Sequence, residues 1–124
     1  MKSKKFIKNI ITYGYDIMNA KIHKELDLIK EGILQVVPAE AIYLFGSFAD
    51  GMPNMDSDID IYVVVPNDIE NMAELYGDIL GSIRKRTLFP MDLLVGHSEV
   101  FNRRKNGPTM EKVIAQKGVV LHGP

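Results

Sequence analysis

Two aspartates, Asp58 and Asp60, stand at the head of an apolar stretch that runs to Val65. Residues i and i+2 of a strand project from the same face, so strand geometry would place both carboxylates together, roughly 6.5–7 Å apart along the backbone. Like charges there repel, and partial burial raises the cost. A divalent cation such as Mg²⁺ would hold both carboxylates ionised. The alternative is a solvated strand start, because Asp56 makes this region acidic in any case.

A Gly-Ser turn, Gly46 and Ser47, follows an earlier apolar run. Glycine lets the backbone approach a ligand closely. A serine at a helix start offers its hydroxyl beside free N–H groups, which together can bind a phosphate. The pattern therefore predicts a phosphate nest. An ordinary N-cap, with Ser47 starting a short helix through Asp50, is the alternative.

A third carboxylate, Asp92, opens the apolar segment 91–95. If this segment and 59–65 are neighbouring strands, Asp92 lies beside Asp58 and Asp60 at one sheet edge. Three carboxylates there could hold two cations about 3.5–4 Å apart, the arrangement used in phosphoryl and nucleotidyl transfer.

The elements that position these residues follow from periodicity and turn signals. Strands are predicted at 41–45, 59–65, 91–95 and 119–121. Helices are predicted over much of the first 37 residues, where Ile22, Leu26, Ile29 and Ile33 share one face, and at 72–86, 98–105 and 109–118. The connection 46–57 is too short for a crossover helix, so the first two strands should be antiparallel. The helix at 72–86 permits a parallel, right-handed crossover to the third. The fold class is α/β (α+β), a mixed β-sheet flanked by helices.

Local signals refine these boundaries. Asn67 begins a capping-box pattern, and Ser98 is a predicted helix cap. His97 follows the third strand near the predicted site, where a capping or solvated role is expected. Tyr62 and Tyr76 are expected to be packing residues.

The basic triplets 84–86 and 103–105 suit helix C-termini, because cations there favour the helix dipole. A phosphate or partner contact is the alternative for these triplets.

Composition excludes several classes of protein. At 124 residues, 46% hydrophobic and 25% charged, the chain suits a single soluble domain, with a helical segment at 1–37 and a core at 40–122 that contains the candidate site residues. A net charge of −1 argues against coating nucleic acid or membranes. With no cysteine and three scattered histidines, a zinc site is not expected. No apolar run approaches ~20 residues and the N-terminus lacks a secretory pattern, so we expect a cytoplasmic protein.

The motif positions together resemble a known family. Gly46-Ser47 with Ala49 and Gly51, then Asp58-x-Asp60, then a lone Asp92, is similar to the polymerase-beta-type nucleotidyltransferase superfamily, and within it to the minimal nucleotidyltransferases (MNT). The resemblance runs from about Ile42 to Leu121 and includes the tail KVIAQKGVVLHG. Phe48 and Asp50 stand where many members carry arginine or another polar residue, so the contacts of such side chains are not expected here.

The resemblance implies a mechanism. Gly46 and Ser47 would bind the β- and γ-phosphates of a nucleoside triphosphate. Asp58 and Asp60 would bind two Mg²⁺ ions. Asp92 would ligate one ion and help to deprotonate an acceptor hydroxyl that attacks the α-phosphorus.

The resemblance also implies partners. The donor would be ATP and the transferred group AMP. In the minimal group the acceptor is often a helical HEPN-type toxin encoded alongside, as part of a toxin–antitoxin system. A non-catalytic antitoxin of the same fold and an aminoglycoside-type small-molecule enzyme are the competing functions.

The apolar N-terminal segment before Gly14 could pack on a partner or on a second copy in a homo-oligomer.

Overall fold

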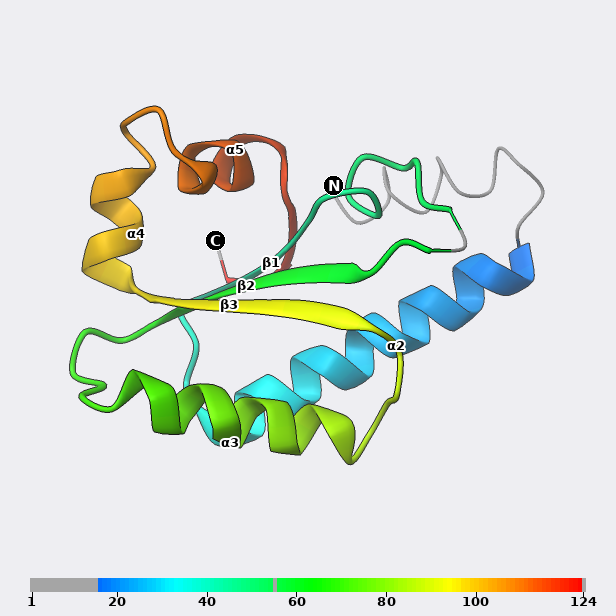
Figure 1. Cartoon of the computed structure of the whole chain (residues 1–124), viewed down its shortest axis with the longest axis horizontal. Coiled ribbons are helices and arrows are strands. Elements are labelled where there is room, and N and C mark those ends of the chain that lie inside the picture. The colour runs from blue at the N-terminus through cyan, green and yellow to red at the C-terminus, as the bar shows by residue number, and fades with distance from the viewer. Residues whose placement is uncertain (1–15, 55, 124) are drawn as a thin grey trace.

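The computed structural model describes residues 16–54 and 56–123 (Figure 1). Its elements are α2 (Asp16–Val36), β1 (Ala41–Phe45), β2 (Ile59–Val65), α3 (Met72–Arg84), β3 (Met91–His97), α4 (Ser98–Arg104), α5 (Met110–Lys117) and β4 (Val119–His122). The predicted bounds of the first two strands are confirmed. The apolar segment before Gly14 lies outside the described residues.

The strands form one mixed sheet in the order β3-β2-β1-β4. β1 pairs antiparallel with β2 and with β4, and β2 pairs parallel with β3. The antiparallel and parallel pairings expected from the two connections are therefore confirmed. β4 forms one edge, as predicted for 119–121, and β3 forms the other.

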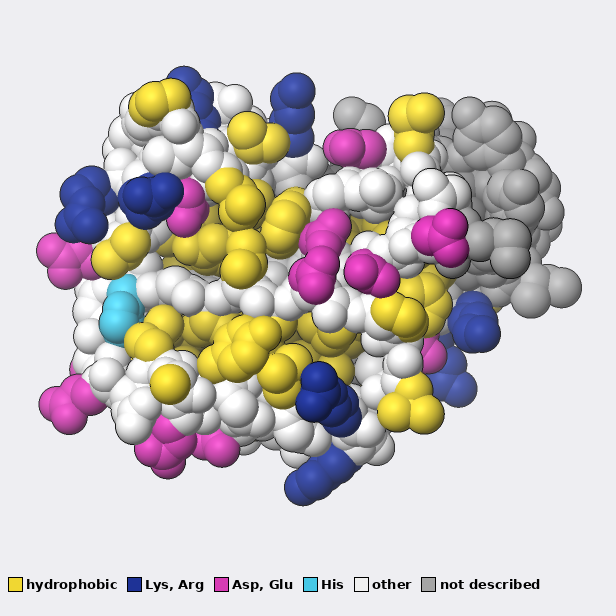
Figure 2. Space-filling view, viewed as in Figure 1, with side chains coloured by type: hydrophobic (Ala, Val, Ile, Leu, Met, Phe, Trp, Pro, Cys, Tyr) yellow, Lys and Arg dark blue, Asp and Glu magenta, His cyan; other side chains and the backbone are white. Residues whose placement is uncertain are grey.

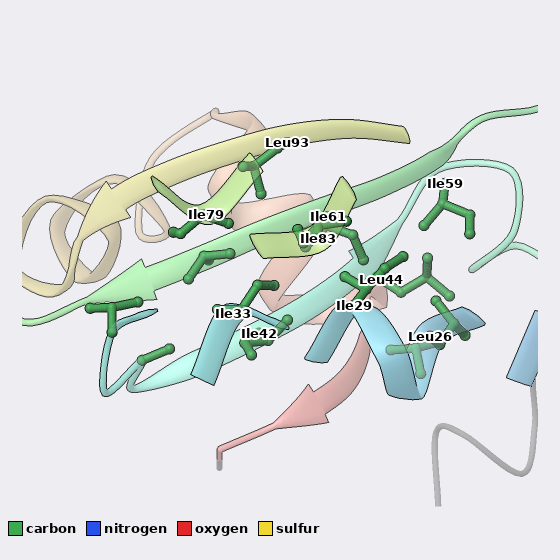
Figure 3. Packing of buried hydrophobic residues seen from close by; sticks show 14 of the residues in the cluster. Leu26, Ile29, Ile33, Ile42, Leu44, Ile59, Ile61, Ile79, Ile83 and Leu93 are labelled. Carbon is green, nitrogen blue, oxygen red and sulfur yellow. The ribbon is translucent and has the colours of Figure 1, made fainter. Parts of the chain in front are cut away.

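One face of the sheet packs against α2 and α3 (Figures 1 and 3). The predicted face of α2 is confirmed, because Ile22, Leu26, Ile29 and Ile33 are each at most 6% exposed. In Figure 3 the side chains of Leu26, Ile29 and Ile33 point toward the sheet, where Ile42 and Leu44 of β1 and Ile59 and Ile61 of β2 lie. This cluster is the main hydrophobic core.

The opposite face packs against the shorter α4 and α5. The Phe101 ring of α4 lies 5.5 Å from the Tyr43 ring and 5.2 Å from the Tyr62 ring, centroid to centroid. The Tyr62 hydroxyl also donates to Glu111 Oε2 of α5 at 3.2 Å. Glu111 Oε1 is buried, and its partner is Arg104 Nε at 3.0 Å. Tyr62 is thus a packing residue, as expected, that also ties α5 and α4 to β2.

Two predicted caps are wrong. The N-cap of α3 is Asn71, whose side chain accepts from the Glu74 amide, whereas the Asn67 side chain accepts from the Glu99 amide. Ser98 is the first residue of α4 after its N-cap His97, and its hydroxyl donates to Glu40 Oε1. The Asn67 and Ser98 side chains therefore hydrogen-bond to residues that are distant in sequence and cap neither helix.

Several other details differ from the prediction, including the ends of α3, α4, α5 and β4, each by one or two residues. Residues 47–51 form hydrogen-bonded turns in place of a short helix. β3 continues two residues beyond 95, because Gly96 and His97 pair with Val64 and Val65. No helix in the described ranges combines the length and apolar character needed to cross a membrane.

Candidate active site

The Gly46 turn lies directly against the Asp60 side chain. Phe45, the last residue of β1, is the antiparallel partner of Asp60, so Gly46, which follows it, lies at the same end of the sheet as Asp60. Gly46 has φ +75°, and a Cβ placed on it would lie 2.1 Å from Asp60 Oδ2. Both observations require glycine here, one for the backbone angle and the other for the space. The turn and the carboxylate therefore form a single site.

Asp60 and Asp92 are register partners in the parallel pair of β2 and β3. Burial is the largest influence on the Asp60 carboxyl, followed by the negative charge of Asp92 and a hydrogen bond shared with it, and last by the charge of Asp58. All of these raise the pKa of Asp60. The two carboxylates are therefore close enough to compete for ionisation.

Asp58 lies two residues before Asp60 in the chain. It precedes β2, is exposed, and acts on Asp60 through its charge alone. The structure thus places all three predicted aspartates at one end of the sheet, with Asp60 and Asp92 close together and Asp58 further out.

Ser47 is exposed at the turn itself. The turn is closed by the amides of Asp50 and Met52, which donate to the carbonyls of Gly46 and Ser47 at 3.0 and 3.1 Å. Within the described part of the chain, neither the Ser47 hydroxyl nor the Ser47 and Ala49 amides donate to a protein acceptor. These donors are the ones that a phosphate nest requires.

The donor chemistry suits a hard divalent cation. Carboxylate oxygens are the ligands that Mg²⁺ prefers, and a cation would relieve the repulsion that raises the Asp60 pKa. Over residues 16–54 and 56–123, no three His, Cys, Asp or Glu side chains form a ready-made metal group. The Asp60–Asp92 pair would therefore be the fixed part of such a site, with Asp58 turning inward to join it.

A pocket of about 370 Å³ opens from Asp60 and Asp92 toward the β3 edge. Its walls come from β1, α3, β3 and the start of α5, and its lining includes Leu80, Leu94 and Met110. In Figure 2, hydrophobic side chains gather over β3, α3 and α5, and acidic side chains lie at one end of this apolar area. The site therefore continues from a charged end into an apolar one.

Sequence reasoning missed this pocket. Tyr76, expected to be a packing residue, is 39% exposed and lines the pocket together with Leu80 and Arg84. Their i, i+4, i+8 spacing on α3 was the available signal. His97, expected near the site, ends β3 at the far end from Asp92, and its Nε2 lies 2.7 Å from the Ile69 carbonyl oxygen.

A family model described as "Polymerase beta, Nucleotidyltransferase" matches residues 27–123. The chain therefore belongs to the polymerase-beta nucleotidyltransferase family, and the match includes all five predicted site residues: Gly46, Ser47, Asp58, Asp60 and Asp92.

A solved structure has the same fold. It is a candidate nucleotidyltransferase from Sulfolobus solfataricus, 18% identical, and the superposition covers 99% of this chain and 88% of that chain with a TM-score of 0.54. No curated protein matches the sequence.

Proposed function

We propose that this protein transfers a nucleoside monophosphate, AMP from ATP, to an acceptor hydroxyl with the help of Mg²⁺. The observation that carries the proposal is that the Gly46 turn, Asp60 and Asp92 lie together at one end of the sheet. The Gly46 turn lies over the Asp60 carboxylate, and Asp60 faces Asp92 on the next strand. Family membership supports the same reaction class.

Different residues of the site would bind the phosphates and the metal. The Ser47 hydroxyl and the amides of Ser47 and Ala49 would hold the β- and γ-phosphates. Asp60 and Asp92, joined by Asp58, would hold Mg²⁺, which supplies positive charge against the triphosphate and the leaving group. The protein would chiefly orient the reacting groups.

The transfer itself is an in-line displacement. The acceptor oxygen bonds to the α-phosphorus, the bond from that phosphorus to the β-phosphate oxygen breaks, and pyrophosphate leaves. The hydroxyl proton passes to the exposed Asp92 carboxylate and from there to water.

We further propose that the acceptor hydroxyl belongs to a HEPN-type helical partner, in a toxin–antitoxin pair whose toxin is silenced by the modification. The pocket beside Asp92 is open at the surface, and both Leu94 and Met110 on its rim are exposed. Such a pocket suits an acceptor presented by another molecule.

The test uses ATP labelled in two positions. The protein is incubated with Mg²⁺, the candidate partner and ATP labelled at either the α- or the γ-phosphate. We expect the α-label alone on the partner, with loss of transfer in Asp92→Asn. Asp68→Asn, which changes an exposed carboxylate beyond the opposite end of β2, is the matched control.

Other results would replace the proposal. Transfer of the γ-label would indicate a kinase. Silencing of the partner that persists in Asp92→Asn without any label would indicate a non-catalytic antitoxin.

A further inference from the structure

The apolar pocket ends at an arginine that the site chemistry does not explain. Tyr76, Leu80 and Arg84 lie on one face of α3 and line the pocket shared with Asp60 and Asp92. Only residues 85–90 separate the end of α3 from Met91 at the start of β3. Arg84 is therefore at the same end of β3 as Asp92.

The Arg84 guanidinium is available to a ligand. It is exposed, and among residues 16–54 and 56–123 it has neither an ion-pair partner nor a hydrogen-bond acceptor. Its neighbour Arg86 is committed to the fold, because it donates to the Ser82 carbonyl at 2.8 Å and to Gln35 Oε1 at 2.6 Å. Of these two arginines, the one in the pocket is the one left without a partner.

The order of elements across the sheet indicates from which side the acceptor hydroxyl approaches. The Gly46 turn follows β1, Asp60 is on β2, Asp92 is on β3, and α3 lines the pocket at the β3 edge. Attacking and leaving oxygens lie roughly in line in phosphoryl transfer. With the leaving pyrophosphate at the Gly46 turn, the attacking hydroxyl comes from the β3 side, where Arg84 lies.

We propose that Arg84 selects the acceptor, and that the acceptor carries an anionic group on an apolar body beside the hydroxyl that receives the nucleotide. This inference rests on the proposed function for its assignment of the pocket to the acceptor. The apolar walls contact the body of the acceptor, and Arg84 pairs with its carboxylate or phosphate.

The binding test uses small probes with the full-length protein. NMR titrations compare para-hydroxyphenylacetate, para-hydroxybenzylphosphonate and the neutral para-hydroxyphenylacetamide. We expect the wild-type protein to bind at least one anionic probe about three- to tenfold more tightly than the amide. Arg84→Gln should remove this preference while leaving the affinity for the amide unchanged, and Arg84→Lys should retain part of it. Whichever anion shows the preference identifies the group on the acceptor.

The matched control is Arg103→Gln, which removes an exposed arginine in the last turn of α4, outside the pocket. It should keep the full preference for the anion. Equal affinity of the wild type for all three probes, no binding of any of them, or the same loss in Arg103→Gln would overturn the inference.

A transfer assay separates this inference from the proposed function. With α-labelled ATP and the preferred anionic probe as acceptor, Arg84→Gln should raise KM by the same factor and leave kcat nearly unchanged. Transfer with an unchanged KM in Arg84→Gln would overturn the inference and leave the proposed function standing. A binding preference that needs Arg84, without label transfer to any acceptor, would overturn the proposed function and leave an anion site.

Discussion

A Cβ on Gly46 would overlap Oδ2 of Asp60, at 2.1 Å. Gly46→Ala should therefore move the carboxylate as well as strain the turn, whose φ is +75°. We expect a loss of about 1–2 kcal/mol in the free energy of unfolding and loss of nucleotidyl transfer. Urea titration and the labelled-ATP assay would measure the two effects.

Gly77→Ala is the matched control for that variant. Gly77 is exposed on α3, and a Cβ there meets nothing within 4 Å. This substitution should stabilise the protein by about 0.5–1 kcal/mol and leave transfer intact. A Gly46→Ala protein with full activity would contradict the close packing of turn and carboxylate.

Asp60→Asn should stabilise the protein at neutral pH in the absence of metal. The pKa of Asp60 is raised in the folded state by burial and by Asp92 and Asp58. The folded state then binds more protons than the unfolded state, so its stability falls as pH rises from the ordinary value of 3.8 through the raised pKa. The variant should lack this part of the pH dependence in urea titrations from pH 3 to pH 8.

With Mg²⁺ present, the wild type should become more stable than Asp60→Asn, the reverse of the order expected without metal. A cation bound by Asp60 stabilises the folded wild type, whereas Asp60→Asn should show little change in Tm. Asp56→Asn, at an exposed position in the preceding loop, should respond to Mg²⁺ as the wild type does. An equal shift in Tm for wild type and Asp60→Asn would exclude Asp60 as a ligand.

Tyr62→Phe should change the alkaline limb of the stability curve. Burial, then the charge of Glu111 and the hydrogen bond to it, raise the pKa of Tyr62 from 10.0 to about 12. Between these values the unfolded chain releases the phenol proton and the folded chain keeps it, so wild-type stability falls as pH rises. The variant should lose less stability over the same interval in denaturant titrations. Equal slopes in the two proteins would contradict the buried Tyr62–Glu111 contact.

Asn71→Ala should destabilise α3 by about 1 kcal/mol, because the Glu74 amide loses its acceptor. Asn71→Asp should restore most of the loss, since aspartate is an equally good N-cap. Thermal unfolding monitored by circular dichroism would measure both variants. A neutral Asn71→Ala would mean that this cap contributes nothing to stability.

The sequence predicted the sheet well because each strand is a short apolar block with clear ends. Pro66 stops β2, and the antiparallel pairing of β1 and β2 followed from the length of one loop. The juxtaposition of Asp60 and Asp92 then required only that β2 and β3 be neighbours.

Contacts between distant residues could not be read in this way. The Asn67 side chain matched a capping pattern but accepts from Glu99, 32 positions away. Tyr62 bonds to Glu111 across 49 positions, with no periodicity to reveal it. The pocket at Arg84 depends on how α3 lies along β3, which the spacing of one helix does not determine.

Successive side chains of β2 point to opposite faces of the sheet. Ile59, Ile61 and Val63 are fully buried in the main core, while Asp60 and Tyr62 lie on the other side. A slip of one position would turn the acid toward the main core and move the isoleucines to the opposite face of the sheet. Correct folding of this strand and assembly of the reaction centre are thus a single event, and a misaligned molecule would be both unstable and inert.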